Sequence, residues 1–477
     1  MAFWNRRKSI DAAGASDESK RLKPTLSWYH LVAMGVGAIV GTGIYTLTGI
    51  GAGLAGPAVI LSFGLCGVIC ACAAFCYAEM ATMMPAAGSA YTYTYVVLGE
   101  LLAWIVGWSL ILEYTVAASA VAVGWSAHVA EFIQAAGWPV PDQLLHGMMS
   151  GGLIDLPAVI ISAAVTLLLI IGTRESATVN LFLVAIKILA LILFVFLAAQ
   201  SFDPALFHPF APFGYAAHVD PDGVKRGVLA AAALIFFAFY GFDAVSTAAE
   251  ETKKPARDLT VGIIGSMVIC TLIYIAVSGA ALGASSYLDF SQTGAPLVYI
   301  LDFLHHGFEA QIVAGAAIVA LPTVILVLMY GQSRIFFVMA RDGLLPQNLS
   351  MVHKTRGTPV LMTTITGVVV AVLAATLKLD QIALLANAGT LCAFVAVAVC
   401  MLVLRVRDPN RARAFRTPLP WIIGPVCIVG CLYLFLNGLP LFTQGWFLIW
   451  NGIGLIGYFA YGAWRSGLAR KAQESLK

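Results

Sequence analysis

Residues 34–56 read MGVGAIVGTGIYTLTGIGAGLAG, and this stretch decides how the rest of the chain is interpreted. It is apolar enough to enter a lipid bilayer and has no charged residue, yet eight of its residues are glycine. Each glycine weakens a helix interior by about 1 kcal/mol relative to alanine. Inside a bilayer, an unwound turn survives only against protein or a polar cavity. We therefore expect a helix break at Gly41-Thr42-Gly43; the alternative is that the glycines only let helices pack closely.

The whole chain has the composition of a membrane protein. Its 477 residues are 60% hydrophobic and 11% charged, whereas a soluble domain has about 25% charged residues. Apolar runs long enough to cross a bilayer recur along its length, which predicts an all-α polytopic membrane protein. A net charge of +3 without a basic patch argues against a nucleic-acid partner. The first 24 residues are polar, so we expect no cleavable signal.

The apolar runs predict twelve transmembrane helices. They lie at about 29–50, 57–82, 99–125, 157–172, 178–199, 227–250, 260–284, 312–340, 359–378, 381–404, 419–440 and 446–464. Most Lys and Arg residues fall in alternate loops and in the two tails, which places both termini in the cytoplasm. The expected organisation is a cytoplasmic tail (1–24), a transport core of spans 1–10 (25–404), spans 11 and 12 with a basic cytoplasmic loop before them (405–465), and a C-terminal cytoplasmic tail (466–477).

A second interrupted span strengthens the interpretation of the first. Span 6 reads GVLAAAALIFFAFYGFDAVSTAAEE, with five aromatic residues around Gly241 and an acid, Asp243, directly after them. Spans 1 and 6 hold matching places if the first ten spans divide into two repeats, at about 29–199 and 227–404. Five spans per repeat is an odd number, so the repeats are inverted in the membrane. Paired glycine-interrupted spans in two halves predict a transporter binding site.

Few ionisable residues fall at membrane depth, where an unpaired charge is costly. Glu113 and Lys187 lie near the middle of spans 3 and 5. Burial disfavours the charged form of an amine, so Lys187 is a candidate proton carrier and Glu113 its partner or relay; the alternative is a static salt bridge between them. Asp243 is a candidate for ordering the span 6 break. Glu79 and Arg334 lie nearer the inner ends, where pairing at a gate or snorkelling is expected.

Two connecting segments carry further expectations. Residues 83–98 hold Tyr91, Tyr93 and Tyr95 in alternation and no Lys or Arg, and we expect a short helix at the membrane interface. The outer segment 285–311 is expected to cap an outer vestibule, with His305-His306 in a solvated loop.

The sequence shows no motif for catalysis or metal binding. The nine cysteines lie in apolar runs without a zinc-ligand spacing, so we interpret them as buried filling residues and expect no metal site. A phosphate-binding GxxxxGK[ST] loop is absent, which disfavours ATP-driven transport.

Three motifs together resemble the amino acid–polyamine–organocation superfamily. They are GVGAIVGTGIY (35–45), GPAVILSFGLCGV (56–68) leading to YAEMATMMPAAGSAYTY (77–93), and FFAFYGFDAVSTAAEETKKPARDLTVGIIGS (236–266). More narrowly, they are similar to the bacterial form of the cationic amino acid transporter branch, over residues 25–465. The resemblance implies a leucine-transporter-type fold of five plus five inverted helices with two further helices.

The resemblance also implies roles for individual residues. The amides of Gly41, Thr42 and Gly43, beside Ile39 and Val40, would bind a substrate α-carboxylate. The carbonyls of Phe237, Ala238 and Tyr240 would accept from its α-ammonium. Phe237 would be the outer gate, Asp243 the acid after the break, Lys187 the proton-coupling lysine in place of a sodium ion, and Glu113 the acid of span 3.

These observations predict a proton-coupled importer of L-amino acids in the plasma membrane, working by alternating access, and not an enzyme. The proton is the coupling ion and no other cofactor is expected; the partners are an L-amino acid and the lipid bilayer, and a small accessory subunit stays open. Cationic, broad and small neutral substrates all remain open. The alternatives are an exchanger of amino acids or polyamines, and a transport fold retained as a sensor.

Overall fold

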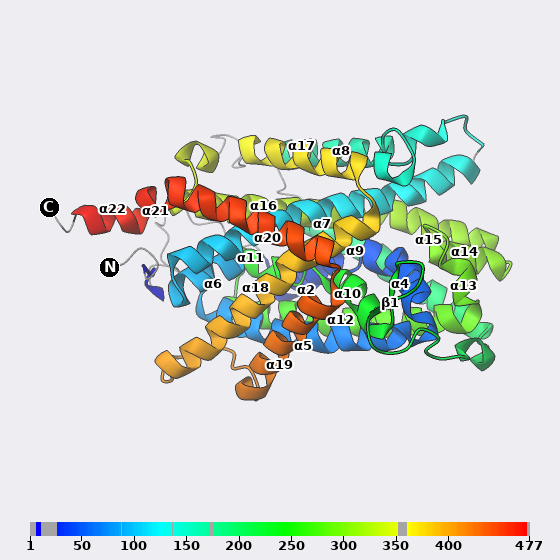
Figure 1. The fold of residues 1–477 in the computed structure, drawn as a ribbon, viewed down its shortest axis with the longest axis horizontal. Helices are drawn as coiled ribbons and strands as arrows, with labels where there is room; N and C mark the ends of the chain where they lie inside the picture. Colours follow the sequence, from blue (N-terminus) through cyan, green and yellow to red (C-terminus); the bar gives the residue numbers. More distant parts are fainter. Residues whose placement is uncertain are drawn as a thin grey trace.

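The computed structural model of the chain is a bundle of helices that run mostly along its long axis (Figure 1). It describes residues 6–10, 26–86, 88–135, 137–171, 176–351 and 360–474. Within these residues, β1 (His218–Val219) and β2 (Lys225–Arg226) pair as an antiparallel hairpin. Of the predicted tails, residues 1–5, 11–24 and 475–477 lie outside the described residues. The all-α prediction is confirmed.

Helix occupies each of the predicted spans. The α-helices that form these spans, whole or in pieces, are α2 (Trp28–Ile39), α3 (Thr42–Tyr45), α4 (Leu47–Ala55), α5 (Val59–Met83), α7 (Glu100–Ala135), α8 (Leu156–Ile171), α9 (Ser176–Gln200), α10 (Val228–Ile235), α11 (Ala244–Thr247), α12 (Pro255–Ala284), α15 (Gly307–Ala320), α16 (Pro322–Arg341), α17 (Val360–Thr376), α18 (Leu379–Arg407), α19 (Pro420–Tyr433) and α20 (Leu441–Gly457).

Short helices connect or cap these elements. The α-helices among them are α6 (Ser89–Val97), α13 (Tyr287–Phe290), α14 (Pro296–Phe303), α21 (Ala463–Arg465) and α22 (Gly467–Glu474). The tighter 3₁₀ turns are η3 (Gly56–Ala58), η4 (Asp142–Leu144), η5 (Met148–Ser150), η6 (Pro204–Phe207), η7 (Phe236–Phe239), η8 (Ala249–Glu251) and η9 (Gln347–Ser350). Two π-helical turns, η10 (Leu434–Gly438) and η11 (Tyr458–Gly462), follow α19 and α20.

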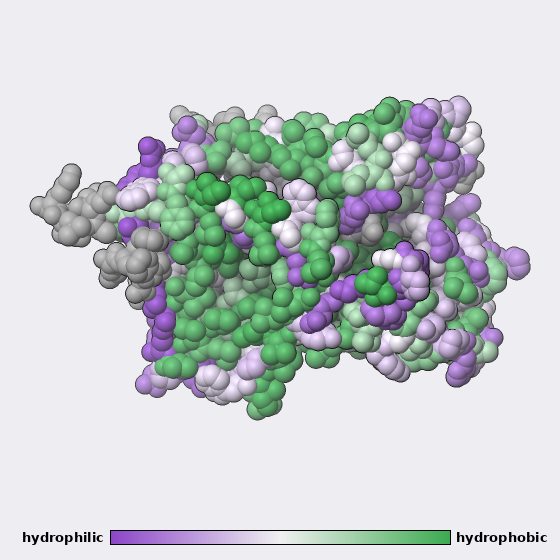
Figure 2. Space-filling model, in the orientation of Figure 1, coloured by the Kyte–Doolittle hydropathy of each residue, from purple (hydrophilic) through white to green (hydrophobic). Residues whose placement is uncertain are grey.

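The surface of the bundle is that of a membrane protein. Figure 2 shows a broad hydrophobic band between two ends where hydrophilic residues gather. In the described part of the chain, eight helical stretches are long and apolar enough to cross a membrane, and α2, α8 and α17 are shorter apolar helices. The number of twelve crossings and the inverted repeat stay predictions.

Helix α7 is longer than the apolar pattern predicts. The expected end was residue 125, whereas the helix continues to Ala135. The extension carries Ser126 and His128, and both side chains are buried. Ser126 bonds to Asp155 before α8, and a ring nitrogen of His128 lies 2.9 Å from the Gly124 carbonyl oxygen. The apolar run ends before these polar residues, whereas the helix continues through them because their side chains are hydrogen-bonded inside the bundle.

The segment 83–98 forms the predicted short helix, α6, which the bundle encloses. Every residue of α6 is buried. The Tyr91 and Tyr95 hydroxyls donate to Asp342 at 3.0 Å and to Glu100 at 2.9 Å. The partly exposed carboxylate of Asp342 and the buried carboxylate of Glu100 supply the partners that these hydroxyls would otherwise find in water. The position of α6 at the membrane interface stays a prediction.

Ion pairs join helices at one end of the bundle, and the described N-terminal and C-terminal residues lie at this same end. Glu79 accepts hydrogen bonds from Arg405 at 2.6 Å and from Arg413 at 3.0 Å. Arg334 pairs with Glu251 at 3.2 Å, so both inner ionisable groups are paired as predicted. Arg6 donates to the Ala463 carbonyl. The described N-terminal residues and the C-terminal helices therefore lie at the same end, called the inner end below.

At the opposite end, the segment 285–311 folds into α13 and α14. Helix α13 contacts α4, and α14 packs on α9 and α15. His305 is exposed, as predicted, and the ring of His306 lies 3.8 Å from the Glu309 carboxylate.

Candidate substrate site

The first predicted break is present in span 1. Helix α2 ends at Ile39 and α3 begins at Thr42, with Gly41 in an extended conformation between them. The first amides of a helix have no acceptor within it. The turn therefore leaves the amides of Gly41, Thr42 and Gly43 together at the N-terminal end of α3, where the partial positive charge of the helix favours an anion.

Span 6 is broken at the matching place. Helix α10 ends at Ile235, η7 follows, and Tyr240 is extended before α11 begins at Ala244. Gly241 has φ +118°, and a Cβ atom there would lie 2.7 Å from the Cβ atom of Ala38 on α2. Only glycine fits this conformation and this close approach.

The two breaks contact each other through their backbones. A Cβ atom at Gly43 would lie 2.4 Å from Cα of Ala238. The Tyr274 hydroxyl, on α12, lies 2.6 Å from the Ile39 carbonyl oxygen and 2.8 Å from that of Ala238. Tyr274 therefore joins the end of α2 to η7. The Ala238 carbonyl already has this donor, and the Phe237 carbonyl already accepts from the Tyr240 amide at 3.3 Å. The sequence analysis missed Tyr274, although a tyrosine in the middle of apolar span 7 was a usable signal.

Lys187 lies behind the first break. Its side chain is fully buried, and Nζ donates to the carbonyl oxygens of Gly37 at 2.8 Å and of Val40 at 3.0 Å. These carbonyls are among those that the end of α2 leaves without an intrahelical donor. Lys187 and Glu113, both described, form no ion pair, so the static salt bridge between them was wrong.

The acids of spans 3 and 6 lie near each other on the other side of the break. Asp243 and Glu113 are both fully enclosed, and each lies within electrostatic range of the other. The Tyr114 hydroxyl donates to Oδ2 of Asp243 at 2.6 Å. Oδ1 of Asp243 and both carboxylate oxygens of Glu113 have no hydrogen-bond partner among the described residues. The sequence pattern did not predict the role of Tyr114, because its partner Asp243 lies on another span.

Aromatic and aliphatic side chains enclose the breaks. Phe237 is buried and its ring stacks on that of Tyr240, with centroids 6.1 Å apart. The built Cβ position at Gly41 meets Val324 of α16 at 3.2 Å and Leu321 at 3.9 Å. The wall that span 8 forms opposite these amides is therefore apolar.

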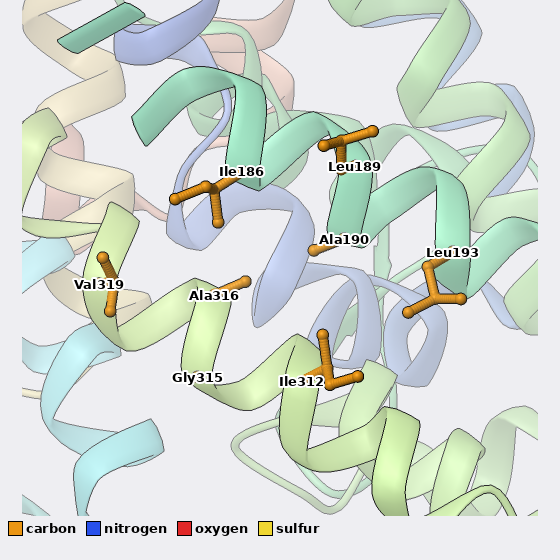
Figure 3. Close-up of a pocket in the computed structure, with 8 residues that line it drawn as sticks. All are labelled: Ile186, Leu189, Ala190, Leu193, Ile312, Gly315, Ala316 and Val319. Carbon is orange, nitrogen blue, oxygen red and sulfur yellow. The ribbon is translucent and has the colours of Figure 1, made fainter. Parts of the chain in front are cut away.

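A separate groove lies outside this region. It has a volume of about 350 Å³ and is lined only by aliphatic residues and glycine of α9 and α15 (Figure 3). Figure 3 shows Ile186 and Leu193 of α9 opposite Ile312 and Val319 of α15. The groove offers no polar side chain to a zwitterion, so it is not the substrate site.

Comparison with known proteins shows the family of the chain. The family model described as "Amino acid permease" matches residues 26–459. The branched-chain amino acid permease BcaP of Bacillus subtilis (strain 168) is 44% identical over 96% of this chain and 97% of its own. The methylthioribose transporter of the same organism is 40% identical over 97% and 98%. Cationic amino acid transporter 4, vacuolar, of Arabidopsis thaliana is 37% identical over 85% and 67%.

These matches cover nearly the whole chain, including both breaks. The family consists of transporters and not of enzymes, and its fold is that of a polytopic membrane protein. The chain therefore belongs to the amino acid permease family of the amino acid–polyamine–organocation superfamily.

Proposed function

We propose that the protein is a secondary active transporter that imports L-amino acids with protons across the plasma membrane. The observation that carries the proposal is the close contact between Gly43 of α3 and Ala238 of η7, the two elements that border the breaks at Val40–Gly41 and Tyr240–Asp243. The proposed architecture has twelve spans in a five-plus-five inverted repeat with two further helices, and both termini in the cytoplasm. The proposed transport core is 25–404, with 405–465 forming the last two spans and the loop before them.

A zwitterion needs donors for its carboxylate and acceptors for its ammonium, and the two breaks supply both. The amides of Gly41, Thr42 and Gly43 bind the carboxylate, beside Ile39 and Val40. The carbonyls of Phe237 and Tyr240 accept from the ammonium, and the Ala238 carbonyl joins them if Tyr274 turns to Ile39 alone. Phe237 closes the site from outside. Asp243 orders the break, because its carboxylate is held by Tyr114.

Lys187 couples the proton to the first break. A protonated amine has three donors and no acceptor, and two of these hold the carbonyls of Gly37 and Val40. Loss of the proton weakens this hold on the end of α2, so the charge of Lys187 and the shape of the carboxylate site change together. Glu113 acts as a proton relay.

The apolar wall favours neutral substrates over cationic ones. Val324 and Leu321 face the carboxylate site, and a desolvated ammonium or guanidinium side chain finds no partner on this wall. The relative named as a branched-chain amino acid permease fits this wall. The relative named as a methylthioribose transporter makes a thioether sugar the second candidate substrate. Such a sugar has no carboxylate, so it would not need the amides of the first break.

Uptake into proteoliposomes tests the proposal. Labelled leucine, alanine, arginine and methylthioribose are offered with an inward proton gradient, with and without sodium. Uptake of leucine or alanine on the proton gradient alone is expected. Flux only with amino acid loaded inside indicates an exchanger, uptake of methylthioribose alone removes the zwitterion site, and binding without flux indicates a sensor.

A further inference from the structure

Among the described residues, six of the buried side-chain oxygen atoms without a well-formed hydrogen bond belong to the two mid-bundle acids and to three tyrosines of the surrounding helices. They are the carboxylate oxygens of Glu113, Oδ1 of Asp243 and the hydroxyls of Tyr240, Tyr77 and Tyr93, and this set is called the line below. All five side chains are buried. A buried polar atom without a hydrogen bond is costly, and neighbouring orphaned atoms in a polar site are the setting in which internal water is found.

The line begins at the acids in the middle of the bundle. Glu113 on α7 lies beside the Tyr240 hydroxyl and Thr390. The ring of Tyr240 meets that of Tyr114 at 5.9 Å between centroids, and the Tyr114 hydroxyl donates to Asp243. Two carboxylates and two phenols from spans 3 and 6 therefore lie in one buried cluster.

Tyrosines continue the line toward the inner end. Tyr77 of α5 lies within electrostatic range of both acids. Its ring meets the ring of Tyr93, on α6, edge to face with centroids 6.4 Å apart. The Tyr93 hydroxyl lies next to Ser246, and the Ser246 hydroxyl lies 2.7 Å from that of Ser89 at the start of α6.

Other groups face this line from the surrounding helices. The titratable ones are Cys70 and Tyr77 of α5, Tyr93 of α6, Glu113 and Tyr114 of α7, Tyr240 and Asp243 of span 6, and Cys427 of α19. None of these is basic, and Lys187 holds α2 carbonyls instead. A proton on this line therefore meets acids, phenols and thiols but no amine.

We propose that Tyr77 and Tyr93, with Glu113, Asp243 and Tyr240, line a file of internal waters that carries the coupled proton from the mid-membrane acids to the inner end. The protonated carboxyl of Glu113 or Asp243 gives its proton to a neighbouring water. Each water accepts one proton and passes one on, and the last releases it beside Ser89 and Ser246. The carboxylate left behind takes the next proton that Lys187 gives up in the proposed coupling. The inference rests on the proposed proton coupling.

Tyrosines of α5 and α6 provide matched variants. Tyr77→Phe removes a hydroxyl without a hydrogen-bond partner among the described residues, and Tyr93→Phe removes the hydroxyl next to Ser246. Tyr95→Phe, the control, removes a hydroxyl that donates to Glu100 outside the proposed route. Proton-driven uptake is expected to fall at least about tenfold in the first two variants, if one broken water link becomes limiting. Exchange of substrate between equal pools, which needs no net proton release, is expected to stay at the wild-type rate and also reports correct folding. Tyr95→Phe is expected to keep proton-driven uptake.

Hydroxyl-radical labelling tests the waters independently of transport. Radicals made by X-rays from bound water should oxidise Tyr77 and Tyr93 despite their burial, and should spare Tyr95. Wild-type proton-driven uptake in both Phe variants, or no labelling of Tyr77 and Tyr93, overturns the route. If the wild-type protein shows no proton-driven uptake at all, the proposed proton coupling is refuted. Labelling of Tyr77 and Tyr93 would then show internal water that carries no coupled proton.

Discussion

Gly43 and Ala238 meet backbone to backbone, so that a single added carbon at Gly43 would lie 2.4 Å from Cα of Ala238. The contact joins the break of span 1 to the break of span 6. In the proposed site, the amides of one segment and the carbonyls of the other face the same small ligand. The contact leaves no room for a side chain larger than that of glycine at position 43.

Gly43→Val is expected to weaken substrate binding. Overpacking a tight site costs about 1–3 kcal/mol, which corresponds to roughly 5- to 150-fold in Kd. Isothermal titration or scintillation proximity binding measures the change. Gly64→Ala is the control, because a Cβ atom there meets nothing within 4 Å. Wild-type affinity in Gly43→Val would remove the carboxylate from this turn.

Lys187→Ala is expected to abolish the dependence of uptake on the proton gradient while substrate binding persists. The variant loses the only group that the structure shows donating to both Gly37 and Val40 in the described chain. Uptake into proteoliposomes at several external pH values measures the effect. Lys225→Ala is the control, because Lys225 also donates to a backbone carbonyl, that of Asn437, but in the exposed hairpin. An unchanged pH profile in Lys187→Ala would refute its coupling role.

Tyr274→Phe is expected to destabilise the contact between the two breaks. Each buried carbonyl left without a donor costs about 1–3 kcal/mol, and the Tyr274 hydroxyl serves Ile39 and Ala238. We expect a lower thermal midpoint in detergent and slower uptake. Tyr433→Phe, at a side chain that is 42% exposed, should change neither. Equal stability of the two variants would show that Tyr274 does not join the segments.

The glycine pattern predicted the first break, because a helix interior rich in glycine is weak whatever surrounds it. The second break was predicted from Gly241 among aromatic residues, at the place in span 6 that matches the first break. Span positions followed from apolarity for the same local reason. The sequence could not predict that Lys187 holds carbonyls of α2 rather than Glu113, since that choice depends on how two distant spans pack. The same holds for Tyr114 and Tyr274, whose partners lie on other spans.

The segment 83–98 shows the limit of composition. Alternating tyrosines without Lys or Arg suggested a helix at the membrane interface, where a phenol finds both lipid and water. In the structure, Asp342 and Glu100 take the hydroxyls of Tyr91 and Tyr95, and α6 is buried. These acids belong to other elements, α7 and the end of α16, and no local pattern reports their approach.

Phe237→Ala is expected to loosen the closed site. Removing a buried phenylalanine ring costs about 3–5 kcal/mol where the cavity stays open, and Phe237 stacks on Tyr240 beside the second break. We expect faster release of bound substrate to the outside and a lower uptake rate, measured by stopped-flow release and by uptake. Phe182→Ala, at a ring that is 67% exposed, is the control. Wild-type kinetics would remove the gate role of Phe237.

Glu251→Gln is expected to shift the protein toward opening at the inner end. Glu251 pairs with Arg334 at 3.2 Å and accepts from the Tyr330 hydroxyl, and Arg334 lies over the Tyr330 ring at 3.6 Å. These contacts tie the end of span 6 to span 8, and their side chains are largely shielded from solvent.

Removing the charge leaves Arg334 with the ring alone, so the closed arrangement loses its ion pair. We expect faster amide hydrogen exchange in α11 and in the second half of α16, with α19 unchanged as an internal reference. The exchanged pair Glu251→Arg with Arg334→Glu should restore slow exchange if the ion pair is what closes this end. Double-mutant analysis then gives the coupling between the two residues. If the single variants Glu251→Arg and Arg334→Glu have additive effects on exchange, each side chain acts separately. The inner end would then be closed by packing and not by the ion pair.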